Sequence, residues 1–246
     1  MAMSVIIVAT NFILRMIMIS LIKWIGEDTY SQQLKSITNG IFIVQFLNTG
    51  ILLLLVQANL KEYSTYASKI FDGPFTDFLP LWYVGVGYKI VQTMIVNAIF
   101  PFIEFGIAYT KLNVFRKLDH GFWSKDSYKT KKTNMQTYID IYSGPEYLIH
   151  FKYSGMLNVT FVTMMYGIGQ PILFLIAFFS YFILYSIERI LIAYFYQLPP
   201  TFDESMTKNA LKILRWAAVF YMAFGYWMLS NQSIFHNFWG YIEDSA

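Results

Sequence analysis

The segment from Leu81 to Tyr109 reads LWYVGVGYKIVQTMIVNAIFPFIEFGIAY, and it decides the fold class. A helix needs about 20 consecutive, mostly apolar residues to cross the hydrocarbon core of a bilayer. This segment is long enough, and its only charged residues are Lys89 and Glu104. Such a length and composition predict a membrane-spanning helix.

The rest of the chain has the same character. Of its 246 residues, 56% are hydrophobic and only 13% are charged, whereas a soluble globular domain carries about 25% charged residues. Apolar stretches that are candidate spans cover residues 4–24, 37–60, 81–109, 153–169, 171–196 and 211–230. The sequence therefore predicts an all-α membrane protein in which residues 1–230 form one domain of about six transmembrane helices.

The positions of the Lys and Arg residues predict the orientation, because cationic loops stay on the cytoplasmic side of a membrane. With the N-terminus outside, fourteen of the eighteen Lys and Arg residues fall on the cytoplasmic side, and only Lys61 and Lys69 fall outside. The remaining two, Arg15 and Lys89, lie within spans. We therefore expect a cytoplasmic loop over residues 110–152 and a short extracellular tail over residues 231–246.

Polar side chains concentrate in the span over residues 81–109. At about 100° per residue, they share one arc of about 140° on the helix surface; they are Lys89, Gln92, Thr93, Asn97 and Glu104. Ionisable and amide groups are costly in hydrocarbon, so they usually face a bundle interior or a water-filled path. Pro101 removes a backbone hydrogen bond and predicts a kink in the same helix. A kinked helix with a polar stripe is typical of a gating element.

Two neighbouring spans carry smaller polar stripes. Gln45 and Asn48 are three residues apart, and Asn11 and Arg15 are four apart, so each pair shares one helix face. Three such helices can surround a hydrated pathway. The alternative is that the amides only hold helices together, since interhelical hydrogen bonds of this kind contribute about 1 kcal/mol or less.

Signatures of catalysis and of metal binding are absent from the sequence. The chain has no cysteine and three scattered histidines, and it lacks a glycine-rich phosphate loop, HExxH and GxSxG. We therefore expect no enzyme activity, no catalytic residue, no metal site, no cofactor and no nucleic-acid partner. The expected partner is the lipid bilayer itself.

The chain resembles a known family over most of residues 1–230. The similarity rests on the residues Gly144-Pro145-Glu146-Tyr147, Tyr166-Gly167-Ile168-Gly169-Gln170-Pro171, the run FFSYFILY from Phe178 to Tyr185, and Glu188-Arg189. These motifs resemble the membrane core of the OSCA and CSC-like family of osmosensitive, mechanically gated, calcium-permeable cation channels. That family is related in fold to the anoctamins, so the resemblance implies an anoctamin-like helical bundle.

The resemblance also implies roles for single residues. Asn97 and Glu104 would lie on the kinked pore helix, with Pro101 where the family often has glycine, and Gln45 and Asn48 would lie on the adjoining pore helix. Family members have more spans and a large cytoplasmic domain. The chain is therefore expected to be a fragment or a truncated paralogue, with a homodimer or a missing N-terminal channel portion as further possibilities.

These observations lead to three hypotheses. The first is a mechanically or osmotically gated channel of the plasma membrane that passes Ca²⁺, Na⁺ and K⁺, with Glu104 attracting cations at the inner mouth and Lys89 tuning selectivity near the outer one. The second is a phospholipid scramblase, which the fold relation to anoctamins allows. The third is a non-conducting structural subunit, in which the polar stripes only hold helices together.

Overall fold

The structure, a computed structural model, describes residues 2–59, 73–75, 77–120, 133–197 and 204–230. Every named element in those residues is a helix, which confirms the predicted all-α class. The α-helices are α1 (Ala2–Ile25), α2 (Tyr30–Phe46), α3 (Leu52–Gln57), α4 (Pro80–Trp82), α5 (Tyr88–His120), α6 (Met135–Tyr142), α7 (Ile149–Tyr166), α8 (Ile172–Tyr194) and α9 (Ser205–Leu229). Two π-helical segments, η1 (Leu47–Ile51) and η3 (Tyr83–Gly87), join α2 to α3 and α4 to α5.

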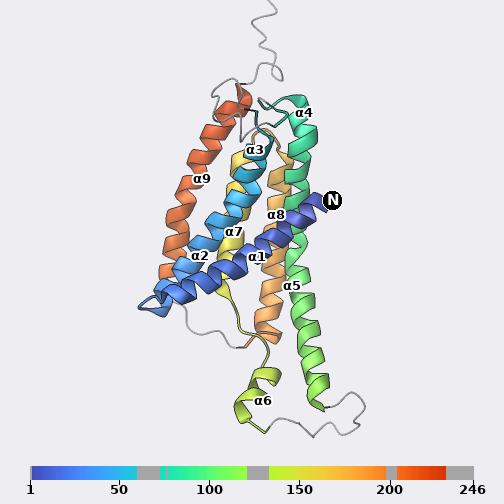
Figure 1. Ribbon diagram of the computed structural model, residues 1–246, viewed down its shortest axis with the longest axis vertical. Coiled ribbons are helices and arrows are strands. Elements are labelled where there is room, and N and C mark those ends of the chain that lie inside the picture. The colour runs from blue at the N-terminus through green and yellow to red at the C-terminus, as the bar shows by residue number, and fades with distance from the viewer. Residues whose placement is uncertain (1, 60–72, 76, 121–132, 198–203, 231–246) are drawn as a thin grey trace, which may run out of the picture.

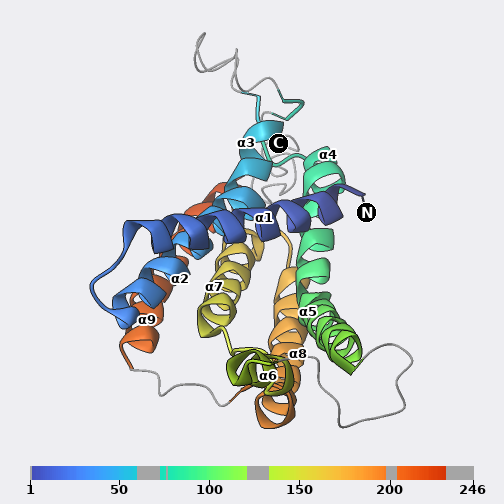
Figure 2. The same cartoon turned by 60° about the horizontal axis from the view of Figure 1, so that its bottom comes forward.

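The long helices form a bundle in which α7 is central (Figure 1). Helix α7 packs against α2, α8 and α9, while α5 packs against α8 and α1. More than half of the residues of α7 are buried. Helix α1 does not run along the bundle but crosses it obliquely over α2 and α5 (Figures 1 and 2).

Three helical stretches are long and apolar enough to cross a membrane. Among the described residues these are Tyr30–Gln57, Pro80–Asp119 and Ile172–Tyr194, which correspond to the expected spans 37–60, 81–109 and 171–196. The other three expected spans form helices α1, α7 and α9. The structure thus supports a membrane protein with three candidate spans, and the count of six stays a prediction.

Helix α7 carries buried polar residues at the centre of the bundle. Its polar residues Ser154, Asn158 and Thr163 are all buried against other helices rather than exposed to a surrounding phase. Ser154 Oγ donates to the carbonyl of Phe151 in its own helix at 3.0 Å, whereas Asn158 Oδ1 and Thr163 Oγ1 have no hydrogen-bond partner among the described residues.

Helix α5 extends further toward the C-terminus than the predicted span over residues 81–109. Helix α5 continues without interruption through Pro101 to His120, so residues 110–120, expected in the cytoplasmic loop, are helical. The short helix α6 lies beside the far end of α5 (Figures 1 and 2). Arg116 of α5 donates hydrogen bonds to the carbonyls of Ile141 (3.4 Å) and Tyr142 (3.2 Å) and thereby holds α6 in place.

The tight reversal predicted from Gly167, Gly169 and Pro171 joins α7 to α8. The N–H of Gly167 donates to the carbonyl of Thr163 at 2.7 Å, and Pro171 occupies the N-cap of α8. A Cβ on Gly167 would lie 2.6 Å from the ring of Phe174. Glycine is therefore required by the close packing of the two helices and not by its backbone angles, since φ is −61°.

The apolar core lies in the half of the bundle near this reversal. Phe42, Phe46, Phe161 and Phe220 form an aromatic group that joins α2, α7 and α9, with ring centroids 4.8 to 5.8 Å apart between the helices. Such edge-on and tilted ring pairs add about 0.5–1.5 kcal/mol each beyond the burial of their area. This core sets how α2 and α7 face one another.

Candidate functional site

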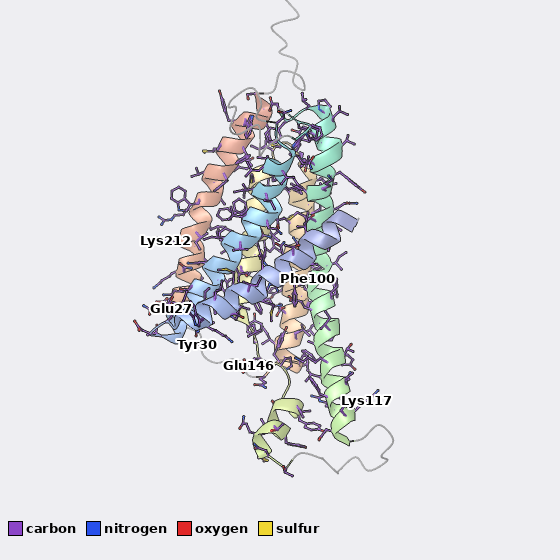
Figure 3. The ribbon with its side chains drawn as sticks, viewed as in Figure 1. Glu27, Tyr30, Phe100, Lys117, Glu146 and Lys212 are labelled. Atoms are coloured by element: carbon purple, nitrogen blue, oxygen red, sulfur yellow. The ribbon has the colours of Figure 1, made fainter. Side chains whose placement is uncertain are left out.

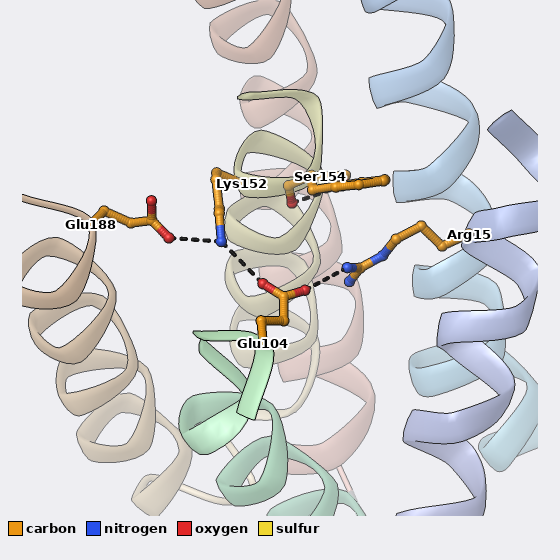
Figure 4. Close-up of polar contacts among 6 residues, drawn as sticks. Arg15, Glu104, Lys152, Ser154 and Glu188 are labelled. Atoms are coloured by element: carbon orange, nitrogen blue, oxygen red, sulfur yellow. Dashed lines mark hydrogen bonds and ion pairs between the residues drawn. The ribbon is translucent and has the colours of Figure 1, made fainter. Parts of the chain in front are cut away.

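Four charged side chains from four helices form a chain of ion pairs in the lower half of the bundle, and we call them the charge cluster: Arg15, Glu104, Lys152 and Glu188. Arg15 Nη1 lies 2.8 Å from Glu104 Oε1, and Lys152 Nζ lies 3.0 Å from Glu104 Oε2. Lys152 Nζ also lies 2.7 Å from Glu188 Oε1. Figure 4 shows these side chains converging from α1, α5, α7 and α8. The cluster therefore ties four helices together at one point.

The signs in the charge cluster alternate, and its net charge is zero. The side chains of Arg15, Lys152 and Glu188 are only 11 to 13% exposed, and that of Glu104 is 29% exposed. Charges this far from water are costly unless they are paired. Glu104 is paired with two cations and Lys152 with two carboxylates, so each inner member has partners on both sides.

Arg15 is also held by aromatic rings. Its guanidinium carbon lies 4.9 Å from the ring centroid of Phe151 and 5.7 Å from that of Phe100. Figure 3 shows Phe100 where α1 crosses α5. Cation–π contacts of this kind contribute about 0.5–2 kcal/mol, more as water is excluded. The oblique crossing of α1 is thus fixed by both charge and ring contacts.

A cavity of about 90 Å³ adjoins the charge cluster. It is partly open and is lined by residues of α1, α2, α5, α7 and α8, which include Arg15, Glu104 and Lys152 of the cluster. A cavity holds one water molecule when the space open to the centre of a water-sized sphere is about 10–15 Å³, measured in the same way as the 90 Å³ here. This one has room for several waters or for an ion with part of its hydration shell.

The cavity lining also contains uncharged polar side chains, which we call the neutral layer: Gln45, Asn97, Asn158 and Ser180. Gln45 and Asn158 are each 4% exposed. The buried Oδ1 of Asn158 accepts no hydrogen bond from any residue that the structure describes. This oxygen is buried within the protein, so it is an unsatisfied acceptor in a residue that lines the cavity.

Three members of the neutral layer lie at similar distances along their helices from the charge cluster. Asn97 precedes Glu104 by seven residues on α5, and Ser180 precedes Glu188 by eight on α8. Asn158 follows Lys152 by six residues on α7, which runs in the opposite direction. At 1.5 Å per residue, all three lie about 9–12 Å along their helices on the same side of the cluster. The site thus has two levels, one charged and one neutral.

The two residues of the stripe predicted on the first span have different partners: Asn11 bonds to the π-helical segment η1, whereas Arg15 pairs with Glu104 of α5. Asn11 Nδ2 donates to Thr49 Oγ1 at 2.9 Å, and Asn48 Nδ2 donates to Asn11 Oδ1 at 2.8 Å. Asn11 lines the cavity, whereas Asn48 does not. The amide of Asn48 therefore attaches α1 to the π-helical segment η1. This is the role that amides have under the alternative in which the polar stripes only hold helices together.

The stripe predicted on residues 81–109 divides into two parts. Asn97, Pro101 and Glu104 line the cavity, but Lys89 and Gln92 do not. Lys89 is half-buried, and its backbone carbonyl accepts a hydrogen bond from Thr93 Oγ1 at 2.8 Å. The structure thus separates Lys89 from the level at which Glu104 lies.

Several residues of the site carry no role in the sequence predictions. Lys152 falls at the end of the expected cytoplasmic loop, Glu188 lies toward the end of the expected span 171–196, and Asn158 lies inside the expected span 153–169 and is buried. One available signal is that Lys152 and Glu188 are opposite charges near the same expected membrane face. Their pairing depends on the α7–α8 hairpin, which brings the start of α7 beside the end of α8.

Comparisons with known proteins give no match: no protein-family model, curated protein or solved structure is significantly similar to this chain. The likeness to OSCA and CSC-like channels therefore rests on the quoted sequence motifs alone. Among the described residues, no group of three His, Asp or Glu side chains is placed to hold a metal ion. The fold and the site are those of an all-helical protein with three described helical stretches long and apolar enough to cross a membrane, and with a charge cluster beside a mainly apolar cavity.

Proposed function

We propose that this chain is a cation channel of the plasma membrane, or the pore module of one, that is calcium-permeable and is gated by membrane tension or osmotic stress. The observation that carries the proposal is the cavity, which has polar and charged side chains in its lining although α2, α5 and α8, three of the helices around it, belong to stretches long and apolar enough to cross a bilayer. Buried ionisable groups in such helices usually mark an ion or substrate path.

In this proposal the charge cluster is the closed gate. Glu104 is bound by both Arg15 and Lys152 and so is not free to attract a passing cation. Opening would separate at least one of these cations from Glu104 and expose its carboxylate to the pathway. Replacing Glu104 by Gln leaves two cations at this level, so we expect the ratio of cation to anion permeability to fall.

Helix α1 is the element through which tension would act. Its inner face carries Asn11 and Arg15, while its outer face is apolar and exposed, with Ile13, Met16 and Trp24 at 53 to 85% exposure. In a bilayer that outer face would contact lipid. A change in lateral tension would then shift α1, and the Arg15–Glu104 ion pair would transmit the shift to α5 near Pro101.

The decisive experiment fills the cavity without disturbing its walls. A Cβ added at Gly155, which lines the cavity, meets no heavy atom within 4 Å, and the same holds for Gly106, which lies outside it. We expect Gly155→Leu to abolish tension-activated cation flux through purified protein in liposomes, and Gly106→Leu to leave it unchanged. Equal flux in both variants, or no flux in the unaltered chain under tension, would refute the proposal.

A phospholipid scramblase is the second candidate, and one observation favours it. Helix α1 forms one wall of the cavity through Asn11, Phe12 and Arg15, and the opposite face of this helix is exposed and apolar. Displacing this single helix would open the cavity sideways to lipid. Labelled-lipid translocation measured beside ion flux in the same liposomes separates the two activities, since a scramblase moves lipid without requiring ion flux.

The third candidate is a structural subunit without flux of either kind. Under that alternative, alanine at Gln92, Asn97 and Glu104 lowers stability and alters no transport. The hydrogen bonds of Asn48 and Asn11 fit this reading for α1 and α2. The unsatisfied Asn158 Oδ1 does not, because a group that only joins helices would be expected to have a partner.

A further inference from the structure

The charged residues that line the cavity are not balanced among themselves. Arg15, Lys152 and Glu104 belong to the lining, whereas Glu188, which pairs with Lys152 at 2.7 Å, does not. The lining therefore carries two cations against one carboxylate, a net charge of +1. Since the space between helices screens charges less than bulk water does, a lining of this sign favours an anion over a cation.

Glu104 shows which kind of anion the two cations hold. Its carboxylate accepts hydrogen bonds from Arg15 Nη1 at 2.8 Å and from Lys152 Nζ at 3.0 Å, and Figure 4 shows the two cations reaching it from different sides. Of the five N–H donors of a guanidinium, Glu104 takes one, and the Nε–H is sealed inside the protein. The other three lie on the terminal nitrogens of Arg15, in the fork that matches a carboxylate.

Most of the remaining lining is apolar, and the guanidinium lies beside its aromatic part. Phe100 and Phe151 both line the cavity, and their ring centroids lie 5.7 and 4.9 Å from the guanidinium carbon of Arg15. Phe12 also lines the cavity and is 49% exposed, so the wall formed by α1 reaches the outer surface of this helix. A mainly apolar pocket with a few charged groups fits a ligand that joins an apolar body to a charged head.

We propose that the cavity binds the carboxylate head of a single-chain fatty acid from the membrane, with Arg15 as its main partner and Lys152 as its second. The cavity of about 90 Å³ holds several water molecules, so it takes a carboxylate with its first methylenes but not a glycerophosphate with two chains. The rest of the chain leaves through the opening beside Phe12. Lys152 directly precedes the expected span 153–169, so the head lies near the level of the lipid headgroups.

Binding of this kind has a consequence for the charge cluster. The bound carboxylate competes with Glu104 for Arg15, and the Arg15–Glu104 ion pair is part of the gate in the proposed channel. A bound fatty acid therefore favours opening. This consequence rests on the proposed channel function, whereas the binding itself does not.

Photo-crosslinking of the purified full chain in liposomes tests this site directly. The probe is palmitate with a diazirine beside its carboxylate, and mass spectrometry locates the adducts. We expect a saturable adduct on residues that line the cavity, which unlabelled palmitate removes and its uncharged methyl ester does not. Adducts confined to the outer faces of the helices, or equal competition by the ester, would overturn the assignment.

Two substitutions change the charge of the lining in opposite directions. Arg15→Met lowers it from +1 to zero and should weaken palmitate binding about tenfold. Glu104→Gln raises it to +2 and releases both cations from their shared carboxylate, so it should strengthen binding. A loss of stability alone would weaken binding in both variants, and that result would refute the site.

A second pair of variants keeps the test decisive if Arg15→Met does not fold. Gly155→Leu fills the cavity but leaves its charged residues in place, so it should abolish the cavity adduct, while Gly106→Leu, outside the cavity, should not alter it. Equal adducts in both variants would refute the site.

The outcome is separable from that of the proposed channel function. Tension-activated cation flux in a chain that gives no saturable palmitate adduct would refute the binding site and leave the channel in place. A saturable adduct in the cavity without any tension-activated flux would refute the channel and leave the site in place.

Discussion

The substitution Glu104→Gln should destabilise the protein strongly, because Glu104 is the carboxylate on which two helices other than its own depend. It removes the contacts of 2.8 Å to Arg15 and 3.0 Å to Lys152. Lys152 retains Glu188 at 2.7 Å, but Arg15 has no second carboxylate among its described ion pairs. The consequence is a guanidinium that is 11% exposed and no longer paired.

The size of the expected stability loss follows from how deeply the ion pairs of Glu104 are buried. Removing one partner of a fully buried ion pair costs about 3–5 kcal/mol. Glu104 is 29% exposed, and the carbonyl of the new Gln can still accept one hydrogen bond, so we expect a loss of about 2–3 kcal/mol. The assay is the free energy of unfolding of the purified chain in detergent, titrated with a denaturant and followed by circular dichroism.

The matched control is Glu204→Gln. Glu204 forms an ion pair with Lys208 at 2.6 Å, shorter than those of Glu104, but the two side chains are 75% and 69% exposed. Exposed pairs contribute about 0–1 kcal/mol, so this substitution should change the free energy of unfolding by about 0.5 kcal/mol or less. Equal effects of the two substitutions would refute the reasoning from burial.

A double-mutant cycle then assigns the effect to a named pair. Arg15→Met removes the cation that Glu104→Gln leaves unpaired and keeps much of its apolar length. The double variant should therefore lose less stability than the sum of the two single variants, with a coupling energy of about 1.5 kcal/mol. A coupling energy below about 0.5 kcal/mol would mean that the two side chains act independently.

Three further predictions concern the rest of the fold. Tyr166→Phe removes a buried hydroxyl that donates to the carbonyl of Gly50 at 2.8 Å, so the free energy of unfolding should fall by about 1–2 kcal/mol; an unchanged value would mean that this carbonyl has another donor. Gly167→Ala should destabilise the α7–α8 reversal, because its Cβ would lie 2.6 Å from an aromatic ring, whereas Gly155→Ala, in open space on the same helix, should stabilise by up to about 1 kcal/mol. Arg116→Ala removes two hydrogen bonds between α5 and α6 and leaves that of Tyr142 Oη to Asp119 Oδ2, so amide hydrogen exchange in residues 135–142 should accelerate while exchange in α7 stays the same.

Within a single helix, periodicity predicted the relevant side chains well. The spacing of Asn97 and Glu104 at about 100° per residue placed them on one face, and both line the same cavity. The same reasoning placed Lys89 on that face, yet Lys89 does not reach the cavity. The face of a helix on which a residue lies follows from the residue's position in that helix alone. Whether the residue also lines a cavity depends on where the other helices pack along its length.

The partners of Glu104 could not be predicted from its own helix. Arg15, Lys152 and Glu188 are distant in sequence from Glu104 and from one another, and an ion pair requires that their helices meet at the same level. Glu104 consequently changes its role, from a free carboxylate that attracts cations to a carboxylate bound on two sides.

Composition and periodicity alone were sufficient for the all-helical class, the apolar segments and the polar face of α5, because these depend on each residue and its near neighbours. The tertiary structure was needed for the oblique course of α1, the burial of α7 and the pairing of the four charges. Those features depend on contacts between segments far apart in sequence, and the favourable pairing of buried charges depends on their separation in space. The physical difference is one of range: helix formation is local, whereas ion pairs and a cavity between helices exist only once several helices have packed.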